Sequence, residues 1–461
     1  MDILQYRSVY FLGIGGIGMS ALARYFRWNG ASVSGYDKTE TALTRQLTAE
    51  GIPVHYDENP ELIPDPVDLV VYTPALPKDH KELLFVLEKG VPLKKRSEVL
   101  GMITGKAKTI AIAGTHGKTT ITTMVAHLLK AAGKESISFL GGISKNYHTN
   151  LILSGMPECQ PTGLPEYFVA EADEFDRSFL RLFPSIAVIT SADADHLDIY
   201  GTLDEVRLSF GRFTSQLQKN GTLILKKGMG IIPEKAENYT ILTYSLESGA
   251  DFYPERVRLE KSRFVFDLVT PGRTIPDITL GLPGKFNLEN AIAASAVACV
   301  TGITDDAMVQ ALGNFEGVER RFDFQVLTDD FVYIDDYAHH PEELKACIRA
   351  VREIFPDKKI TGIFQPHLFT RTRDFADAFA RSLELLDVLI LLEIYPAREN
   401  PLPGIDSAML LEKVKIQNKI LCSKTDVAAA LKEINPQVLL TLGAGDIDQL
   451  VKPIRELFSN K

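Results

Sequence analysis

Short apolar runs rich in β-branched residues alternate with amphipathic helical patterns along the chain, and this alternation limits the folds open to it. Examples of such runs are residues 8–12, 108–113 and 360–364, with helical patterns between the runs. The alternation is typical of βαβ units, in which a helix connects two parallel strands. The sequence therefore predicts an α/β fold.

Three such units follow one another along the chain. We expect residues 1–106 to form a Rossmann-like N-terminal domain, residues 107–318 a central P-loop ATPase-like domain, and residues 319–461 a Rossmann-like C-terminal domain. The stretch from about 220 to 280 differs, because turn residues separate its short β-like pieces TLIL, YTILTY and RFVFDLV. This stretch predicts a small antiparallel excursion from the central domain.

The charge balance excludes several classes of protein. Of the 461 residues, 50 are Lys or Arg and 60 are Asp or Glu, which gives a net charge of −10. A chain this acidic is not a general binder of nucleic acid or of membrane surfaces. Its 4 cysteines form no CxxC pair, and no apolar run reaches the roughly 18 residues of a membrane span. We expect a cytoplasmic protein that binds small molecules, with neither nucleic acid nor membrane as a partner.

The first glycine-rich loop has the pattern G-x-G-x-x-G at Gly13, Gly15 and Gly18, between a predicted strand and a predicted helix. Small residues let the backbone approach a diphosphate, whose charge the helix N-terminus receives. The pattern fits a nicotinamide dinucleotide, a nucleotide sugar, or a tight turn without a ligand. Asp37, at the end of the next strand, is a candidate for a ribose or uracil contact or for capping the loop.

A second loop, GTHGKTT, follows the strand at 108–113 and opens another helix. The strict P-loop pattern would place its first glycine at Ile112, so this is a shortened variant. We expect backbone N–H groups to hold the phosphates of ATP, Lys118 to reach the β and γ oxygens, and the Thr119 hydroxyl to bind Mg²⁺. His116 either contacts phosphate or stabilises the loop. The nucleotide-binding candidates are Gly114, Thr115, His116, Gly117, Lys118, Thr119 and Thr120.

Acidic residues and one histidine follow the next two predicted strands, where a P-loop domain places its metal ligands. Of these, Glu171 lies directly at a strand end, so it is the favoured ligand, and His196 is a candidate for metal binding or proton transfer. The full set of candidates is Glu171, Asp173, Glu174, Asp176, Asp195 and His196.

Taken together, the motifs resemble those of the Mur ligases, the ATP-dependent amide-forming enzymes of peptidoglycan precursor synthesis. The resemblance rests on GIGGIGMS (13–20), GTHGKTT (114–120), EADEFDRSFL (171–180), DADHLDIYG (193–201), LPGKFNLENAIAA (282–294), GVERRFD (317–323), DDYAHHP (335–341) and FQPHLFTRTRDF (364–375). The resemblance also rests on ENPLPGIDS (399–407), and the motifs span all three predicted domains. FQPHLFTRTRDF and ENPLPGIDS favour the branch of the family that adds alanine.

The resemblance implies a role for each matching residue. It places Gly15, Gly16 and Gly18 near the diphosphate of a UDP-sugar, and Glu171 and His196 at Mg²⁺. It further implies adenine contacts for Asn287 and Asn290, a phosphate contact for Arg321 and a ribose contact for Asp336. The incoming amino acid would meet Tyr337, His339 and Arg371, with Arg373 as a second candidate for its carboxylate. Leu368 stands where the family often has arginine.

The implied reaction joins L-alanine to the lactyl carboxylate of UDP-N-acetylmuramate through an acyl phosphate, with ATP and Mg²⁺, in a monomer or homodimer. Lys118 would stabilise the transferring phosphoryl group, and His196 or His339 would act as the base. Three alternatives stay open on the sequence. They are the tripeptide-adding ligase of the same family, an NAD-dependent oxidoreductase that uses the first glycine loop, and a P-loop protein that switches without synthesis.

Overall fold

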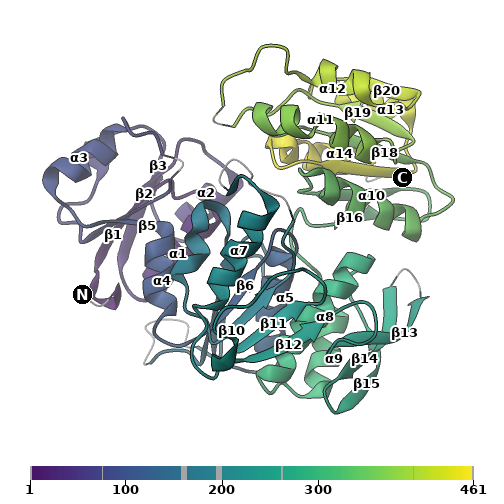
Figure 1. Ribbon diagram of the computed structural model, residues 1–461. Coiled ribbons are helices and arrows are strands. Elements are labelled where there is room, and N and C mark those ends of the chain that lie inside the picture. Colours follow the sequence, from purple (N-terminus) through teal and green to yellow (C-terminus); the bar gives the residue numbers. More distant parts are fainter. Residues whose placement is uncertain are drawn as a thin grey trace. The chain divides into compact units, whose positions relative to one another are not determined.

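The computed structural model (Figure 1) describes residues 3–74, 76–156, 163–193, 200–260, 263–397 and 399–458, and the strands in these residues form four sheets. The α/β prediction is confirmed. The chain divides into two compact units, of which the first contains Met1–Glu260, Phe264–Gly281 and Leu288–Glu316, and the second consists mainly of Gly317–Lys461. Within the described ranges, no helix combines the length and the apolar character that crossing a membrane requires.

The N-terminal sheet is parallel and has the strand order β3-β2-β1-β4-β5, which is the Rossmann order. Ligands of such sheets bind beyond the carboxyl ends of the strands where the order reverses, here beside β1. The first glycine loop follows β1 and therefore lies at this point. The elements are β1 (Ser8–Leu12), α1 (Ile17–Trp28), β2 (Ser32–Tyr36), α2 (Ala42–Ala49), β3 (Val54–His55), β4 (Leu69–Tyr72), α3 (Lys81–Lys89), β5 (Leu93–Lys95), α4 (Arg96–Thr104) and 3₁₀ turns at Ile3–Gln5 and Pro60–Leu62.

The central sheet has the order β12-β11-β10-β6-β9-β7-β8, and only β8 runs antiparallel to its neighbour among these described strands. Because β6, β9 and β10 are adjacent and parallel, the loops that follow them meet at one edge of the sheet. The elements are β6 (Lys108–Ala113), α5 (Lys118–Ala131), β7 (Ser136–Phe139), β8 (Leu151–Ser154), β9 (Tyr167–Ala172), a 3₁₀ segment (Phe175–Arg181), β10 (Ile186–Ile189), α7 (Leu203–Thr214), β11 (Thr222–Lys226), a 3₁₀ turn (Ala236–Asn238), β12 (Thr240–Tyr244), α8 (Lys285–Val300) and α9 (Asp305–Asn314).

The antiparallel excursion is smaller than the sequence predicted. It contains β13 (Tyr253–Glu260), β14 (Arg263–Thr270) and β15 (Arg273–Thr279). The pieces TLIL and YTILTY were wrongly assigned to it, because β11 and β12 extend the central sheet in parallel. Leu223 and Ile224 are adjacent and both fully buried, which is typical of a parallel strand covered on both faces.

The C-terminal sheet has the order β16-β17-β21-β18-β19-β20, in which β16 pairs antiparallel with β17. The loops after β17 and β18, which carry the predicted amino-acid site, leave the same edge because both strands run parallel to β21 between them. The elements are β16 (Asp323–Leu327), β17 (Val332–Asp336), α10 (Pro341–Ile354), β18 (Ile360–Phe364), α11 (Phe369–Leu383), β19 (Val388–Leu391), α12 (Ser407–Lys413), β20 (Asn418–Leu421), α13 (Val427–Ile434), β21 (Val438–Leu442), a 3₁₀ segment (Asp446–Leu450) and α14 (Val451–Phe458).

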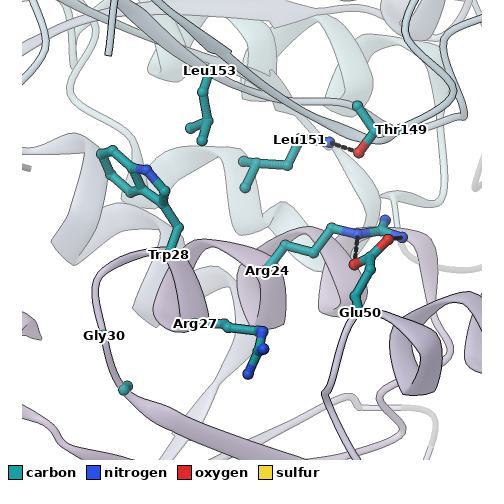
Figure 2. Close-up of a pocket in the computed structure, with 9 residues that line it drawn as sticks. Arg24, Arg27, Trp28, Gly30, Glu50, Thr149, Leu151 and Leu153 are labelled. Carbon is teal, nitrogen blue, oxygen red and sulfur yellow. Dashed lines mark hydrogen bonds and ion pairs between the residues drawn. The ribbon is translucent and has the colours of Figure 1, made fainter. Parts of the chain in front are cut away.

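A buried arginine connects the N-terminal and central sheets within the first unit. Arg24 of α1 forms a two-pronged ion pair with Glu50 at 2.7 and 2.8 Å (Figure 2), and it also donates to Asn150, which precedes β8. Asn150 in turn donates to the Ile17 carbonyl at 2.6 Å and to Ser20 Oγ at 2.8 Å. These bonds fix the start of α1, and with it the first glycine loop, against the central domain.

Candidate active site

The first glycine loop is shaped by backbone bonds to the end of β2. Gly13 has a φ of +86°, and the N–H groups of Gly13 and Ile14 donate to the Tyr36 carbonyl at 2.8 and 2.9 Å. Gly15 donates to Asp37 Oδ2 at 2.8 Å, and a Cβ at Gly15 would lie 2.7 Å from the same oxygen. Asp37 therefore caps the loop. A contact between Asp37 and a ribose or uracil stays a prediction.

The second loop brings backbone N–H groups to the start of α5, where the helix dipole favours an anion. Gly114 has a φ of +134°, and a Cβ there would lie 2.0 Å from Thr190 Oγ1. Gly117, at the N-cap of α5, has a φ of +82°, and its Cβ would lie 2.8 Å from Asn290 Oδ1. Only glycine fits either position. The close approach also places Asn290, a residue predicted to contact adenine, beside the phosphate loop.

Lys118 is held by a carboxylate from the neighbouring loop. Its Nζ donates to Glu174 Oε1 and Oε2 at 2.9 and 2.8 Å and to the Gly114 carbonyl at 2.5 Å. Burial alone would lower the pKa of Lys118, but the carboxylates of Glu174 and Asp173 outweigh burial and raise this pKa. Burial raises the pKa of Glu174, whose side chain is 2% exposed, against the attraction of Lys118. Lys118 is therefore charged and paired with Glu174.

Thr115 and His116 connect the phosphate loop to the loop after β10. The Thr115 and Ser191 hydroxyls lie 2.8 Å apart, and the His116 N–H donates to Ser191 Oγ at 2.9 Å. The His116 ring lies beside Asp193, with 3.5 Å between Nε2 and Oδ2. These contacts stabilise the loop, while a direct contact of His116 with phosphate stays a prediction. Thr119 and Thr120 are both buried in the first turn of α5.

Two oxygen donors at the carboxyl edge of the central sheet fit a magnesium ion held together with nucleotide phosphates. Glu171 lies near the end of β9, where its Oε1 accepts the Gly141 N–H at 2.9 Å, and Thr119, the second residue of α5, offers a hydroxyl. Mg²⁺ prefers such hard oxygen ligands and commonly takes the rest from phosphates and water. No group of three or more His, Cys, Asp or Glu side chains suited to a metal occurs among the described residues. Asp195, His196 and the side chain of Asp176 lie outside them.

Asp173, a candidate metal ligand, and Asn287, a candidate adenine contact, each have a partner within the protein. Asp173 accepts the Phe175 N–H at 3.1 Å and pairs with Arg96 at 3.7 Å, so it faces the N-terminal domain. Asn287 is 1% exposed, and its Nδ2 donates to the Pro283 carbonyl at 2.8 Å. Its predicted adenine contact stays a prediction.

In the second unit, Asp336 organises the loop that follows β17. Its Oδ2 accepts the Phe322 N–H at 2.6 Å, and its Oδ1 accepts the Ala338 N–H at 2.7 Å. Burial raises the pKa of Asp336 to about 7, although the charge of Arg321 and the two N–H bonds lower it. Asp336 thus fixes the backbone on both sides of Tyr337, and its predicted ribose contact stays a prediction.

Arginines and aromatic rings gather around this loop. The guanidinium carbons of Arg320 and Arg321 lie 5.1 and 4.7 Å from the centre of the Tyr337 ring. His339 lies against Tyr337 with ring centres 5.3 Å apart, and its Nδ1 is 3.1 Å from the Tyr337 carbonyl. Because a carbonyl only accepts, Nδ1 carries the proton and Nε2 keeps a lone pair.

Burial lowers the pKa of His339 to about 4, against the attraction of Glu343, and the charge of Arg371 lowers it further. His339 is therefore neutral at pH 7, and Arg371, in the first turn of α11, belongs to the same electrostatic cluster. Arg373 instead pairs with Asp374 at 2.7 Å on an exposed part of the helix. Leu368 precedes α11 with a φ of +71°.

Three residues of this cluster were missed by the sequence reasoning. The Glu343 carboxylate accepts a hydrogen bond from the backbone N–H of His339 at 3.0 Å. The His367 ring lies between the rings of His339 and Tyr395, and the distances between ring centres are 6.0 and 5.7 Å. Arg320 donates to the Gly443 carbonyl at 2.7 Å. The i, i+4 spacing of His339 and Glu343 was a usable signal, whereas Arg320 and His367 are recognised only once the loops are folded.

Three family models match successive segments of the chain. The descriptions "Mur ligase family, catalytic domain", "Mur ligase middle domain" and "Mur ligase, glutamate ligase domain" match residues 8–108, 112–298 and 320–446. The chain is 49% identical over 463 residues to a UDP-N-acetylmuramate–L-alanine ligase from Parabacteroides distasonis, covering 99% of this chain and 98% of the relative. It is 48% identical over 458 residues to the enzyme of that name from Porphyromonas gingivalis, covering 98% of each.

Solved structures agree with the sequence relatives. A UDP-N-acetylmuramate–alanine ligase from Thermotoga maritima matches with a TM-score of 0.83 and 28% identity, covering 98% of this chain and 100% of that one. A murein peptide ligase from Psychrobacter arcticus has the same fold, with a TM-score of 0.71, 21% identity and 99% of each chain covered. The resemblance predicted from the motifs is confirmed, and the chain belongs to the Mur ligase family.

Proposed function

We propose that this chain is the ATP-dependent ligase that joins L-alanine to the lactyl carboxylate of UDP-N-acetylmuramate in peptidoglycan precursor synthesis. The observation that carries the proposal is the presence of two phosphate-binding loops in one compact unit, each at the carboxyl edge of its own sheet. Two such loops fit two phosphate-bearing substrates, a nucleotide sugar and ATP. An oxidoreductase has no use for the second loop, and the family is one of ligases.

Amide formation from a carboxylate is unfavourable in water, so the carboxylate must first be activated. A lactyl carboxylate oxygen attacks the γ-phosphorus of ATP, and ADP leaves. The amine of L-alanine then attacks the acyl carbon, and phosphate leaves with the carboxylate oxygen. Lys118 lies at the N-terminus of α5, where its charge can stabilise the transferring phosphoryl group once it exchanges Glu174 for phosphate.

Mg²⁺, when bound, would offset negative charge on the phosphates, and Glu171, Thr119 and His196 are the residues proposed to hold it. Glu171 supports this role because it lies near the end of β9, the strand beside β6, and offers a carboxylate at the phosphate edge. Substituting glutamine for Glu171 keeps the side-chain shape and weakens a hard oxygen ligand.

The second unit supplies groups suited to an α-amino acid. The fork of Arg371 can bind a carboxylate by two hydrogen bonds, and Nε2 of His339 can accept a hydrogen bond from an amine. A pKa of about 4 makes His339 a poor permanent acceptor for an ammonium proton. This value favours His339 as a group that orients the amine.

The test is phosphate release from ATP with UDP-N-acetylmuramate and single amino acids, followed by mass spectrometry of the product. We expect release with L-alanine, slower release with glycine and L-serine, and none when the UDP-sugar is omitted. One methylene changes discrimination by only about 1–3 kcal/mol, so the smaller and more polar amino acids are poor substrates rather than excluded ones. Release with a tripeptide and not with L-alanine would assign the chain to the peptide-adding ligases instead.

A further inference from the structure

The first turn of α11 has no capping side chain of its own. The helix begins at Phe369, and Leu368 at its N-cap offers no side-chain oxygen to the backbone N–H groups of the first turn. Leu368 also has a φ of +71°, a conformation that persists in a residue with a side chain only where neighbouring segments hold it. Arg371, the residue proposed to bind the amino-acid carboxylate, lies in this turn. Groups outside the helix must therefore fix the turn that carries Arg371.

Glu399, at the start of the ENPLPGIDS stretch, supplies the missing cap. Its Oε2 accepts the Thr370 N–H at 3.0 Å, and its Oε1 accepts the Thr370 hydroxyl. Thr370 is the second residue of α11, so the carboxylate lies at the positive end of the helix. Just before the helix, the Leu368 N–H donates to the Tyr395 carbonyl at 3.0 Å, and the Tyr395 N–H donates to the Pro366 carbonyl at 2.8 Å. The strained residue is thus held on one side by Tyr395 and on the other by Glu399.

We propose that Glu399 is a positioning residue, which fixes the first turn of α11 so that Arg371 presents its guanidinium to the amino-acid carboxylate. The inference rests on the proposed function and adds to it a residue that acts through Arg371 without touching substrate. It also gives the ENPLPGIDS stretch a physical role. Because every α-amino acid has the same carboxylate, Glu399 sets the affinity for amino acids as a class and leaves the preference for a methyl side chain unchanged.

A general stabilising role explains these contacts less well, because the rest of α11 is fixed without Glu399. Phe379 and Leu383 are fully buried in the core of the C-terminal domain. The Ser382 hydroxyl donates to the Pro341 carbonyl at 2.9 Å, which joins the end of α11 to α10. Loss of Glu399 should therefore release the first turn and leave the body of the helix in place.

Asp406, from the same stretch, is a matched control. Its side chain accepts the Met409 N–H at 2.7 Å and caps α12, a helix to which no part of the amino-acid site is assigned. Glu399→Ala and Asp406→Ala each remove a carboxylate cap from the same domain. Both should lower the Tm by roughly 2–4 °C, but only Glu399→Ala should change the use of the amino acid.

The test is steady-state phosphate release with each substrate varied in turn. Glu399→Ala should raise the KM for L-alanine roughly 3- to 30-fold, the range expected for losing a helix cap, and should leave the KM for ATP and for UDP-N-acetylmuramate within about twofold. The KM for L-serine should rise by the same factor as that for L-alanine. Glu399→Gln keeps one acceptor oxygen, so its effect should be smaller, and it serves if the alanine variant does not fold. Thr370→Val removes the hydroxyl bond and keeps the N–H bond, so its effect should also be smaller.

A double variant decides whether Glu399 acts through Arg371. Adding Glu399→Ala to Arg371→Ala should change kcat/KM for L-alanine by less than about twofold, because the group that Glu399 positions is already gone. A full further loss in the double variant would overturn this inference alone. So would an unchanged KM for L-alanine in both Glu399 variants, or an equal rise in Asp406→Ala. Wild-type protein that releases no phosphate in response to L-alanine would overturn the proposed function together with it.

Discussion

Replacing Glu174 by glutamine is expected to tighten nucleotide binding, because this carboxylate occupies the lysine that must receive the phosphates. Lys118 Nζ donates to both Glu174 oxygens at 2.9 and 2.8 Å, and Glu174 is almost fully buried. A phosphate that binds Lys118 has to replace these bonds. Glutamine keeps the shape of the side chain but removes the charge that competes with the phosphate.

The size of the effect follows from the contact. A hydrogen bond to a charged group contributes about 1.5–3 kcal/mol, and glutamine keeps one oxygen that can accept from Lys118. We therefore expect the lower end of this range, about 1.5 kcal/mol, which is a decrease of slightly more than tenfold in the Kd of nucleotide. The same contact stabilises the fold, so Glu174→Gln should unfold more easily without nucleotide and gain more thermal stability when nucleotide is added.

The assay is calorimetry with ADP and with a non-hydrolysable ATP analogue at fixed Mg²⁺. Asp173→Asn is the control, because it removes one negative charge from the same loop. Asp173 raises the pKa of Lys118 by the attraction of its charge, whereas Glu174 also accepts hydrogen bonds from Lys118. The effect of Asp173→Asn should stay below about threefold. Unchanged or weaker nucleotide binding in Glu174→Gln would show that Lys118 keeps Glu174 in the bound state, and the reasoning would be refuted.

Three further predictions concern the two units separately. Lys118→Ala should lower kcat by roughly 10²–10³-fold or more, as for removing one charge-stabilising group. Calorimetry should find unchanged UDP-sugar binding in this variant. Loss of UDP-sugar binding in folded protein would contradict the idea that the two loops bind separate substrates. Arg371→Ala should raise the KM for L-alanine far more than that for ATP, and an unchanged KM would move the carboxylate contact to Arg373 or His339. The pKa of His339, measured by NMR, should lie near 4, below the roughly 6.5 of an unfolded chain. Its contribution to stability is then present above about pH 6.5 and is lost as the pH falls toward 4, whereas a measured pKa above 6 would contradict the burial argument.

The fold was predictable where apolar runs were long and flanked by clear turn signals. The strand at Lys108–Ala113 and the phosphate loop after it are an example, because a glycine-rich turn between a strand and a helix has few alternatives. β5 (Leu93–Lys95) was not predictable, since its Lys94 and Lys95 give no apolar signal. β11 was assigned to the wrong sheet because a short run of apolar and polar residues does not define a pairing partner.

Site residues divide in the same way. Glycines and charged residues inside motifs were found, because their spacing alone indicates the chemistry. Contacts between loops could not be predicted. Examples are the Lys118–Glu174 pair and the position of Arg96 against Gly18. Both depend on how segments far apart in the sequence meet, and one sequence carries no signal for this.

The central claim is that ATP activates the lactyl carboxylate of a UDP-sugar as an acyl phosphate. The most direct measurement uses UDP-N-acetylmuramate with ¹⁸O in both carboxylate oxygens, together with ATP and L-alanine. Because a carboxylate oxygen attacks the γ-phosphorus and leaves with it, each released phosphate should carry one ¹⁸O, and the amide product should keep the other. Release of unlabelled phosphate alongside amide formation would contradict the account.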